Sequence, residues 1–366
     1  MLDRNNLVQL AKVVAKANPS APTAYSWNGE NLSFEVLNET LRKELNEYAG
    51  TYDSYRNNKN MIFSIVEEVI DDVLPKKVEE QYGQFAEVRQ FAQGDKPIFR
   101  RKLGSNKRAK QFITRVGLAG VYEVFKLSRA EEAFEVRTSA IGGAAQVGIE
   151  EFLDGRVDFV ELINIVMEGM DELIYKEIAH ALKASVNQLP PANRVAAAGF
   201  DEAAFDRLLT IAQAYGTPTI YCTYEFAVKM IPQEAWRYTE SMKEELWRTG
   251  RLASYKGHRV VILEQGFEDE TNSRKVIDPG YAWIIPTGAD RKPVKVAFEG
   301  GTLIKEVENH DWSKEFRVYK KVGVVAMLAN NICTYVDTAL LGQMDTWHLN
   351  GASAVKNLVY NIPMTI

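Results

Sequence analysis

Cysteine and histidine are scarce in this chain, with two cysteines and four histidines among 366 residues. Cys222 and Cys333 are not part of a CxxC motif and have no histidine at metal-ligand spacing. A structural zinc site needs several such ligands close together, so we expect none here. Both cysteines lie in apolar, β-rich runs, which favours small buried side chains over reactive nucleophiles.

Long hydrophobic runs are also absent. No stretch approaches the roughly 18–20 apolar residues that a membrane-spanning helix needs. The first residues, MLDRNNLVQLAKVVAKAN, lack the apolar core and the small-residue cleavage site of a signal peptide. Hydrophobic residues make up 46% of the chain and charged residues 25%, which is typical of a globular protein. We therefore expect a soluble protein that is made in a cytoplasm and has no membrane partner.

Motifs for enzyme chemistry are missing as well. The chain has no GxxxxGK[ST] loop for phosphates, and its segments GLAGVY and AIGGAAQVG do not match the GxGxxG pattern of dinucleotide sites. None of His180, His258, His310 and His348 lies in an HExxH motif or in a nucleophile motif. Paired acids fall mostly on polar helix faces, where solvated charge is the ordinary explanation. We predict no catalytic residue, cofactor or metal, and a soluble α+β enzyme is the least favoured alternative.

The most unusual feature that is present is a positive segment in an acidic chain. Residues 98–115, IFRRKLGSNKRAKQFITR, carry seven basic side chains and no acidic one, although the net charge of the chain is −5. The basic residues are Arg100, Arg101, Lys102, Lys107, Arg108, Lys110 and Arg115. A solvated face is the commonest explanation for such a run, and binding to nucleic-acid phosphates is another. A pI of about 5.7 and only two interleaved aromatic residues, Phe99 and Phe112, argue against a dedicated nucleic-acid binder.

Helical periodicity dominates the first eighty residues. Apolar positions recur at spacings of three to five between residues 32 and 48, and a continuous amphipathic face runs from Met61 to Leu74. Pro75 follows this face and is expected to stop the helix. Pro19 and Pro22 predict that the first twenty-odd residues form a separate arm.

The middle of the chain changes from strand patterns to a helix pattern. Between Phe85 and Thr138, β-branched and aromatic residues alternate with polar ones, which predicts a long β-hairpin or extended loop with the basic segment at its tip or along its arms. From about Arg156 to Ser185, the apolar spacing predicts one helix of roughly 45 Å. Asp154 or Asp158 would cap its start, and acids crowd its first half, as the helix dipole prefers.

The remainder of the chain mixes short helix and strand patterns. Helical pieces are predicted within 200–216, 225–239 and 241–250. Strands are predicted at 218–224, 258–265, 281–288, 293–300, 316–328 and 330–339. Since helices and strands are largely segregated and do not strictly alternate, the predicted fold class is α+β.

The order of these parts resembles the major capsid protein of tailed bacteriophages, the Hong Kong 97-type fold that encapsulin shells share. The resemblance covers roughly residues 60–342. It is carried by the extended loop at 84–138 and by the segments VGIEEFLDGRVDFVELINIVMEGMDELIYKEIAHALKAS, RTGRLASYKGHRVVILEQ and RVYKKVGVVAMLANNICTYVD. The chain departs from the family in its more helical first eighty residues and in its tail, GQMDTWHLNGASAVKNLVYNIPMTI.

The resemblance implies a structural protein and no enzyme: a subunit of the icosahedral head shell around double-stranded phage DNA, bound without sequence specificity. It implies hexameric and pentameric capsomers, and portal and scaffolding proteins as partners, with decoration proteins as further candidates. The protein would be assembled in the bacterial host cytoplasm and end in the virion. An encapsulin-like compartment is the nearest alternative.

The resemblance also implies a division of the chain. The expected parts are an amino-terminal arm with helices (1–83), the extended loop (84–138), a peripheral domain with the spine helix (139–191 and 290–328), an axial domain (192–289 and 329–345) and a carboxy-terminal tail (346–366).

An extended loop that lies on a neighbouring subunit would explain the positive segment. Residues 147–180 contain nine acids and two bases, and this local charge of −7 matches the +7 of residues 98–115. The candidate acidic surface is Glu150, Glu151, Asp154, Asp158, Glu161, Glu168, Asp171 and Glu172. Matching charges would steer assembly and set its register, whereas affinity would come from burial of apolar loop residues such as Phe99, Phe112 and Val116.

Overall fold

The computed structural model divides the chain into two compact units. Unit 1 consists of Met1–Pro97, Val136–Tyr175 and Val296–Val324, and unit 2 of Ile98–Glu135, Lys176–Lys295 and Val325–Ile366. The structure describes residues 3–17, 24–27, 29–49, 51–102, 131–147, 159–231, 240–267, 271–272, 274–286, 292–308, 314–326 and 331–341.

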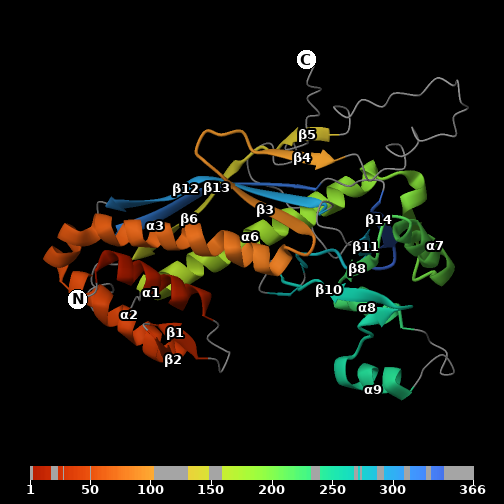
Figure 1. Ribbon diagram of the computed structural model, residues 1–366, viewed down its shortest axis with the longest axis horizontal. Coiled ribbons are helices and arrows are strands. Elements are labelled where there is room, and N and C mark those ends of the chain that lie inside the picture. Colours follow the sequence, from red (N-terminus) through yellow and green to blue (C-terminus); the bar gives the residue numbers. More distant parts are fainter. Residues whose placement is uncertain are drawn as a thin grey trace, which may run out of the picture. The chain divides into compact units, whose positions relative to one another are not determined.

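Unit 1 begins with three helices that pack on one another: α1 (Arg4–Lys16), α2 (Phe34–Ala49) and α3 (Tyr52–Tyr82). A small hairpin of β1 (Tyr25–Trp27) and β2 (Glu30–Leu32) lies beside them (Figure 1). The apolar face of α1 is buried, and Leu7 and Leu10 are fully inaccessible. Glu68 on α3 pairs with Arg4 at 3.1 Å and with Lys12 at 3.3 Å. The prediction of a separate arm is therefore wrong for residues 3–17, because an amphipathic stripe binds this helix to the unit.

Pro75 does not end α3, which continues to Tyr82. A proline inside a helix removes one N–H donor, and the carbonyl four residues earlier loses its partner. Here that carbonyl, on Asp71, instead accepts a hydrogen bond from Nε2 of Gln90 at 3.4 Å. The prediction that Pro75 stops the helix is wrong, because the buried apolar face continues through Leu74 and Val78, and a side chain from the next strand replaces the lost donor.

A four-stranded sheet completes unit 1. Its order is β3 (Ala86–Phe91), β12 (Val294–Glu308), β13 (Lys314–Ala326) and β6 (Ser139–Val147) (Figure 1). The described hairpin of the predicted extended loop is the antiparallel pair β4 (Ile98–Lys102) and β5 (Glu131–Glu135). The hairpin therefore begins at Ile98, whereas the residues from 86 to 91 belong to the sheet.

Buried polar contacts join α3 to this sheet. Asp71 accepts hydrogen bonds from the Thr302 backbone N–H at 2.9 Å and from its hydroxyl at 2.6 Å, and it also pairs with Lys320. Lys320 is 1% exposed. One helical turn earlier, Glu67 accepts a hydrogen bond from the Ile304 N–H at 2.7 Å. Carboxylates on the helix thus satisfy two strand N–H groups and one buried ammonium group.

The predicted long helix is present as α6 (Phe159–Ser185), which contributes residues to both units. Its apolar stripe is buried at Met170, Ile174, Ile178 and Leu182, as the spacing predicts. In unit 1, the Tyr175 ring stacks on Tyr82 with centroids 5.1 Å apart. Both candidate caps, Asp154 and Asp158, lie outside the described residues.

Unit 2 is built on a six-stranded mixed sheet. The strand order is β7 (Arg194–Ala197), β14 (Cys333–Asp337), β11 (Tyr281–Pro286), β8 (Pro218–Cys222), β10 (His258–Ile262) and β9 (Ser254–Tyr255). Its described residues include the helices α7 (Glu202–Gln213), α8 (Tyr224–Lys229) and α9 (Glu240–Thr249) and the short 3₁₀ turns η3 (Val186–Gln188) and η4 (Pro191–Asn193). The α+β class is confirmed, since helices and strands form separate segments.

An aromatic cluster forms the core of unit 2. Phe205, Phe226 and Tyr335 are fully buried and contact one another at centroid distances of 5.7–6.5 Å. Cys222 and Cys333 are free and lie in the same core, and burial raises the pKa of each thiol to about 12. The prediction that both cysteines are small buried side chains is confirmed.

Candidate functional site

The base of the positive segment lies opposite acids of the same chain. In the β4–β5 pair, Arg100 stands opposite Ala133, Arg101 opposite Glu132 and Lys102 opposite Glu131. Opposite charges at paired strand positions are favourable. Two of the seven basic residues therefore stand opposite acids in the strand register, Arg100 does not, and the other four follow Lys102 in the sequence.

Phe99 does not offer apolar surface to a neighbour. It is 0% exposed, pairs with Phe134 in the strand register, and lies 6.0 Å from the ammonium group of Lys295. The prediction that Phe99 is buried between subunits is wrong, because its own chain already covers it. The other residues of that prediction and of the basic segment, namely Lys107, Arg108, Lys110, Phe112, Arg115 and Val116, lie outside the described residues.

The candidate acidic surface is only partly described. Glu150, Glu151, Asp154 and Asp158 lie outside the described residues, and Glu161 is described in backbone only. Glu168 and Glu172 are exposed on α6. Asp171 is 8% exposed and pairs with Lys77 of α3 at 3.4 Å. Of the three acids whose side chains are described, two are exposed and one is buried.

Burial shifts the pKa of two titratable groups in the second half of α6. Burial raises the pKa of Glu177 to about 7. One turn later, burial and the charge of Lys183 lower the pKa of His180. Lys183 itself pairs with the buried Asp278 at 3.0 Å. No sequence motif assigns a role to His180, and Glu177 is not one of the candidate acids named from the sequence.

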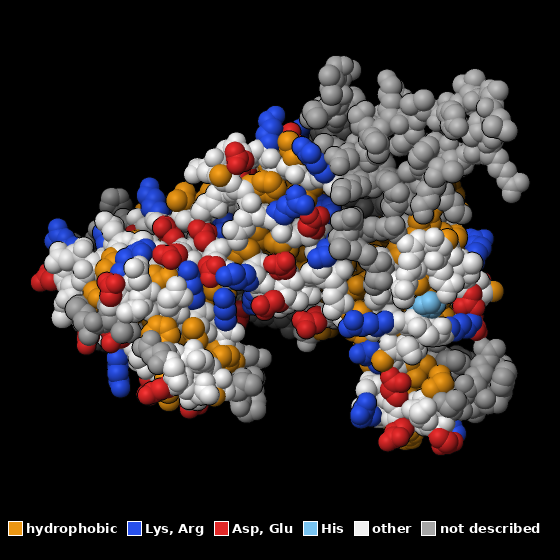
Figure 2. All heavy atoms as spheres, in the orientation of Figure 1, with side chains coloured by type: hydrophobic (Ala, Val, Ile, Leu, Met, Phe, Trp, Pro, Cys, Tyr) orange, Lys and Arg blue, Asp and Glu red, His pale blue; other side chains and the backbone are white. Residues whose placement is uncertain are grey.

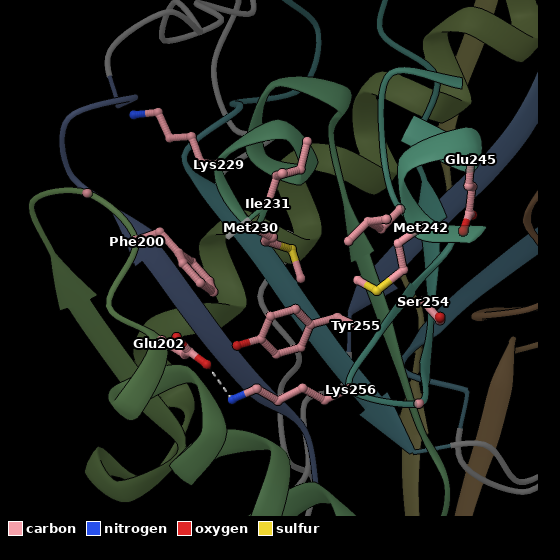
Figure 3. Close-up of a pocket in the computed structure, with 13 residues that line it drawn as sticks. Phe200, Glu202, Lys229, Met230, Ile231, Met242, Glu245, Ser254, Tyr255 and Lys256 are labelled. Atoms are coloured by element: carbon pink, nitrogen blue, oxygen red, sulfur yellow. Dashed lines mark ion pairs between the residues drawn. The ribbon is translucent and has the colours of Figure 1, made fainter. Parts of the chain in front are cut away.

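A pocket of about 940 Å³ opens in unit 2. Its apolar lining includes Phe200, Met230, Met242 and Tyr255, whose side chains point toward one another across the space in Figure 3. These residues come from the β7–α7 connection, the end of α8, α9 and β9. An apolar, methionine-containing concavity of this kind accommodates a hydrophobic side chain or ligand.

Charged groups surround the pocket. Lys256 pairs with Glu202 at 2.6 Å and also with Asp206 (Figure 3). Desolvation lowers the pKa of Lys256, but its hydrogen bonds to Asp206 and Glu202 outweigh this and raise the pKa above the usual range. Lys229 extends away from the pocket and pairs with the fully buried Asp337 at 3.2 Å. Lys256 therefore holds two carboxylates at this edge of the pocket.

Helix α9 projects from unit 2 without burying any of its residues. Its Trp247 is 91% exposed. Glu245 accepts a hydrogen bond from the Ala253 N–H at 2.8 Å. Gly250 follows the helix in the left-handed region, at a φ of 71°, and a Cβ at this position would clash with the Tyr224 hydroxyl. Figure 2 shows side chains of both charge signs around apolar ones on this lobe. Sequence analysis missed this surface, although a lone tryptophan in the polar helix SMKEELWRTG was a usable signal.

The described residues contain no cluster of three or more potential metal ligands. Among the described helices, none is both long enough and apolar enough to cross a membrane.

The chain matches a known protein family over most of its length. Residues 7–336 match the family described as "SPbeta prophage-derived putative capsid protein YonB". No curated protein matches the chain.

Several solved structures share part of the fold at low identity. A phage-related protein from Bordetella bronchiseptica RB50 has 12% identity and a TM-score of 0.48, covering 76% of this chain and 97% of its own. The bacteriophage PhiM1 mature capsid has 7% identity and a TM-score of 0.46, covering 70% and 86%. A virus-like particle from Pyrococcus furiosus has 15% identity and a TM-score of 0.42, covering 75% and 99%.

Because these TM-scores lie below 0.5, the assignment rests on the family match, which extends from α1 to β14. The chain therefore belongs to this family of prophage-derived capsid proteins, and its role is structural.

Proposed function

We propose that this protein is the major subunit of a phage head, which assembles with copies of itself into an icosahedral shell around double-stranded DNA. The observation that carries the proposal is the capsid-family match over residues 7–336. An encapsulin-like compartment is less favoured, because the matched family is one of capsid proteins. In this proposal the shell contains hexameric and pentameric capsomers, is assembled in the host cytoplasm, and has portal, scaffolding and decoration proteins as further partners.

The proposed architecture is that of the Hong Kong 97-type shells. Unit 1 would supply the peripheral domain with the amino-terminal helices, and unit 2 the axial domain around the capsomer centre. Helix α6, the spine, contributes to both units. The hairpin that starts with β4 and β5 would extend onto a neighbouring subunit.

Purified recombinant protein tests the proposal. Electron microscopy and light scattering should reveal closed shells, tubes or ring-shaped capsomers at some ionic strengths. Shell diameter would help to separate a small compartment from a genome container. A salt-insensitive monomer of 41.3 kDa, unchanged by added scaffolding protein, would contradict it.

The positive segment supports a second step of the proposal, in which its charges orient the hairpin on the acidic surface of a neighbour. The residues beyond Lys102 carry this role in the proposal, since Arg101 and Lys102 stand opposite Glu132 and Glu131 in the strand register. On the neighbour, Glu168 and Glu172 are the described acids with exposed side chains. The electric fields of these charges would steer the hairpin toward the neighbouring subunit and set its alignment there, more than they would add to the binding affinity.

Replacing Lys107, Arg108 and Lys110 together with glutamate should reduce the yield of shells at least tenfold, because the segment changes by six charge units and would repel the acidic surface. Circular dichroism should show unchanged subunit folding. A matched control replaces the exposed Lys43, Arg56 and Arg207 with glutamate and applies the same charge change elsewhere. Equal shell yields from the two triple variants would refute the charge-matching proposal.

A further inference from the structure

We propose that Trp247 of one subunit inserts into the pocket of unit 2 in a second copy of the chain, so that subunits contact one another head to tail. This interface, formed by the Trp247 knob and the pocket, rests on the proposed function as a shell protein. The interface adds a specific anchor residue and a specific receptor pocket to that proposed function.

The knob is exposed and held in place before it binds. All ten residues of α9 are described and none is buried, and Trp247 is 91% exposed. The helix end is fixed by the hydrogen bond between Glu245 and the Ala253 N–H and by a second one between Thr249 and Arg251. A rigid tryptophan loses little conformational freedom on binding and buries about 150–250 Å², which suits it to anchor an interface.

The pocket suits an indole ring. Its volume of about 940 Å³ is ample for one aromatic side chain together with neighbouring residues of α9. Phe200 and Tyr255 offer aromatic faces, and Met230 and Met242 offer flexible sulfur-containing chains that adapt to the inserted shape (Figure 3). Trp247 does not line the pocket of its own chain, although Met242 and Glu245 from the same helix do.

Charge around the two surfaces is complementary. Arg248, next to the knob, is exposed and has no hydrogen-bond or ion-pair partner within the described part of the chain. At the pocket edge, Glu202 and Asp206 are partly exposed carboxylates that both contact Lys256. An approaching Arg248 would be attracted to these carboxylates, which would orient the helix as Trp247 enters.

A knob and a pocket that differ from each other make a head-to-tail contact. Such contacts close into rings when the rotation between subunits permits, and otherwise form open filaments. A contact of this class is what five- and six-membered capsomers require. The second copy of the chain is therefore the occupant that fits both the charge pattern and the structural role of the family.

Sedimentation velocity and electron microscopy of the full-length chain test this interface. Trp247→Ala should raise the protein concentration needed for half-maximal assembly at least tenfold without changing the circular dichroism spectrum, whereas Trp247→Phe should retain most assembly. Arg248→Glu and Glu202→Arg should each weaken assembly, and the double variant should regain part of the loss. This rescue would not occur if either residue acted only on folding.

The outcomes separate the interface from the proposed function. If the wild type assembles and Trp247→Ala assembles at the same concentration, the interface is refuted and the shell function stands. If Glu202→Arg impairs assembly but Trp247→Ala and Arg248→Glu do not, the pocket receives a different segment, which also refutes Trp247 as its occupant. A wild-type chain that never assembles refutes both.

Discussion

Asp71→Ala is expected to lower the free energy of unfolding by about 3 kcal/mol, near the lower end of the range for breaking a buried ion pair. The change leaves the side chain of Lys320, which is 2% exposed, without its carboxylate partner. It also removes the acceptor of the Thr302 N–H and hydroxyl. The lower end is expected because Asp71 itself is 35% exposed, and water can partly enter the vacated site. Urea denaturation of the unassembled subunit, followed by circular dichroism, measures the effect.

Two variants show whether the buried ammonium group is the cause. Adding Lys320→Met to Asp71→Ala removes the stranded charge and should recover about 2 kcal/mol of the loss. Asp72→Ala is the matched control on the same helix, because Asp72 pairs with the half-exposed Lys76 and such surface pairs contribute about 0–1 kcal/mol. If Asp71→Ala and Asp72→Ala lower the free energy of unfolding equally, the buried contacts of Asp71 stabilise the fold no more than a surface ion pair does.

The elements that sequence reasoning located are those with a local signal. The stripe of α6 and the helix α7 repeat at helical spacing, and the strand β8 is a short apolar run beside a glycine. Such patterns depend on neighbours a few residues away, so one sequence is sufficient to find them. The fold class followed from the order of these elements, and the resemblance to shell proteins followed from the same order.

The elements that it misjudged depend on distant partners. Pro75 stays inside α3 because Gln90 supplies a donor, and β3 joins a sheet with β12, which lies about two hundred residues later in the chain. Alternation in a strand shows that one face is buried but not which strand pairs with it. Without that register, neither the acids opposite Arg101 and Lys102 in the strand pair nor the burial of Phe99 could be predicted.

Exposure is similarly hard to predict for single residues in the candidate site. A tryptophan in a helix is most often at least partly buried, and only the arrangement of α9 shows that Trp247 faces solvent. The pocket is formed by four separate segments of unit 2, each unremarkable in sequence. Surfaces assembled from distant segments are therefore visible only in the fold.

Glu177→Gln should stabilise the unassembled subunit at pH 8 by about 2–3 kcal/mol and have little effect near pH 4.5. Burial raises the pKa of Glu177 from 4.5 to about 7 in the folded chain, so the folded state keeps a proton that the unfolded state releases. The stability that this group contributes is fully present below pH 4.5 and is lost as the pH rises to about 7. Glutamine carries no charge at any pH and so avoids this loss.

The free energy of unfolding of the variant and of the wild type, measured at intervals between pH 4.5 and 8, tests the prediction through the difference between them. The titration of His180, whose pKa is lowered in the folded chain, largely cancels in that difference because both proteins contain it. Glu168→Gln, at an exposed position of the same helix, is the control and should change stability by less than about 0.5 kcal/mol at every pH. A gain for Glu177→Gln that does not grow between pH 5 and pH 8 would mean that Glu177 stays ionised in the folded chain, and that burial alone does not govern this part of α6.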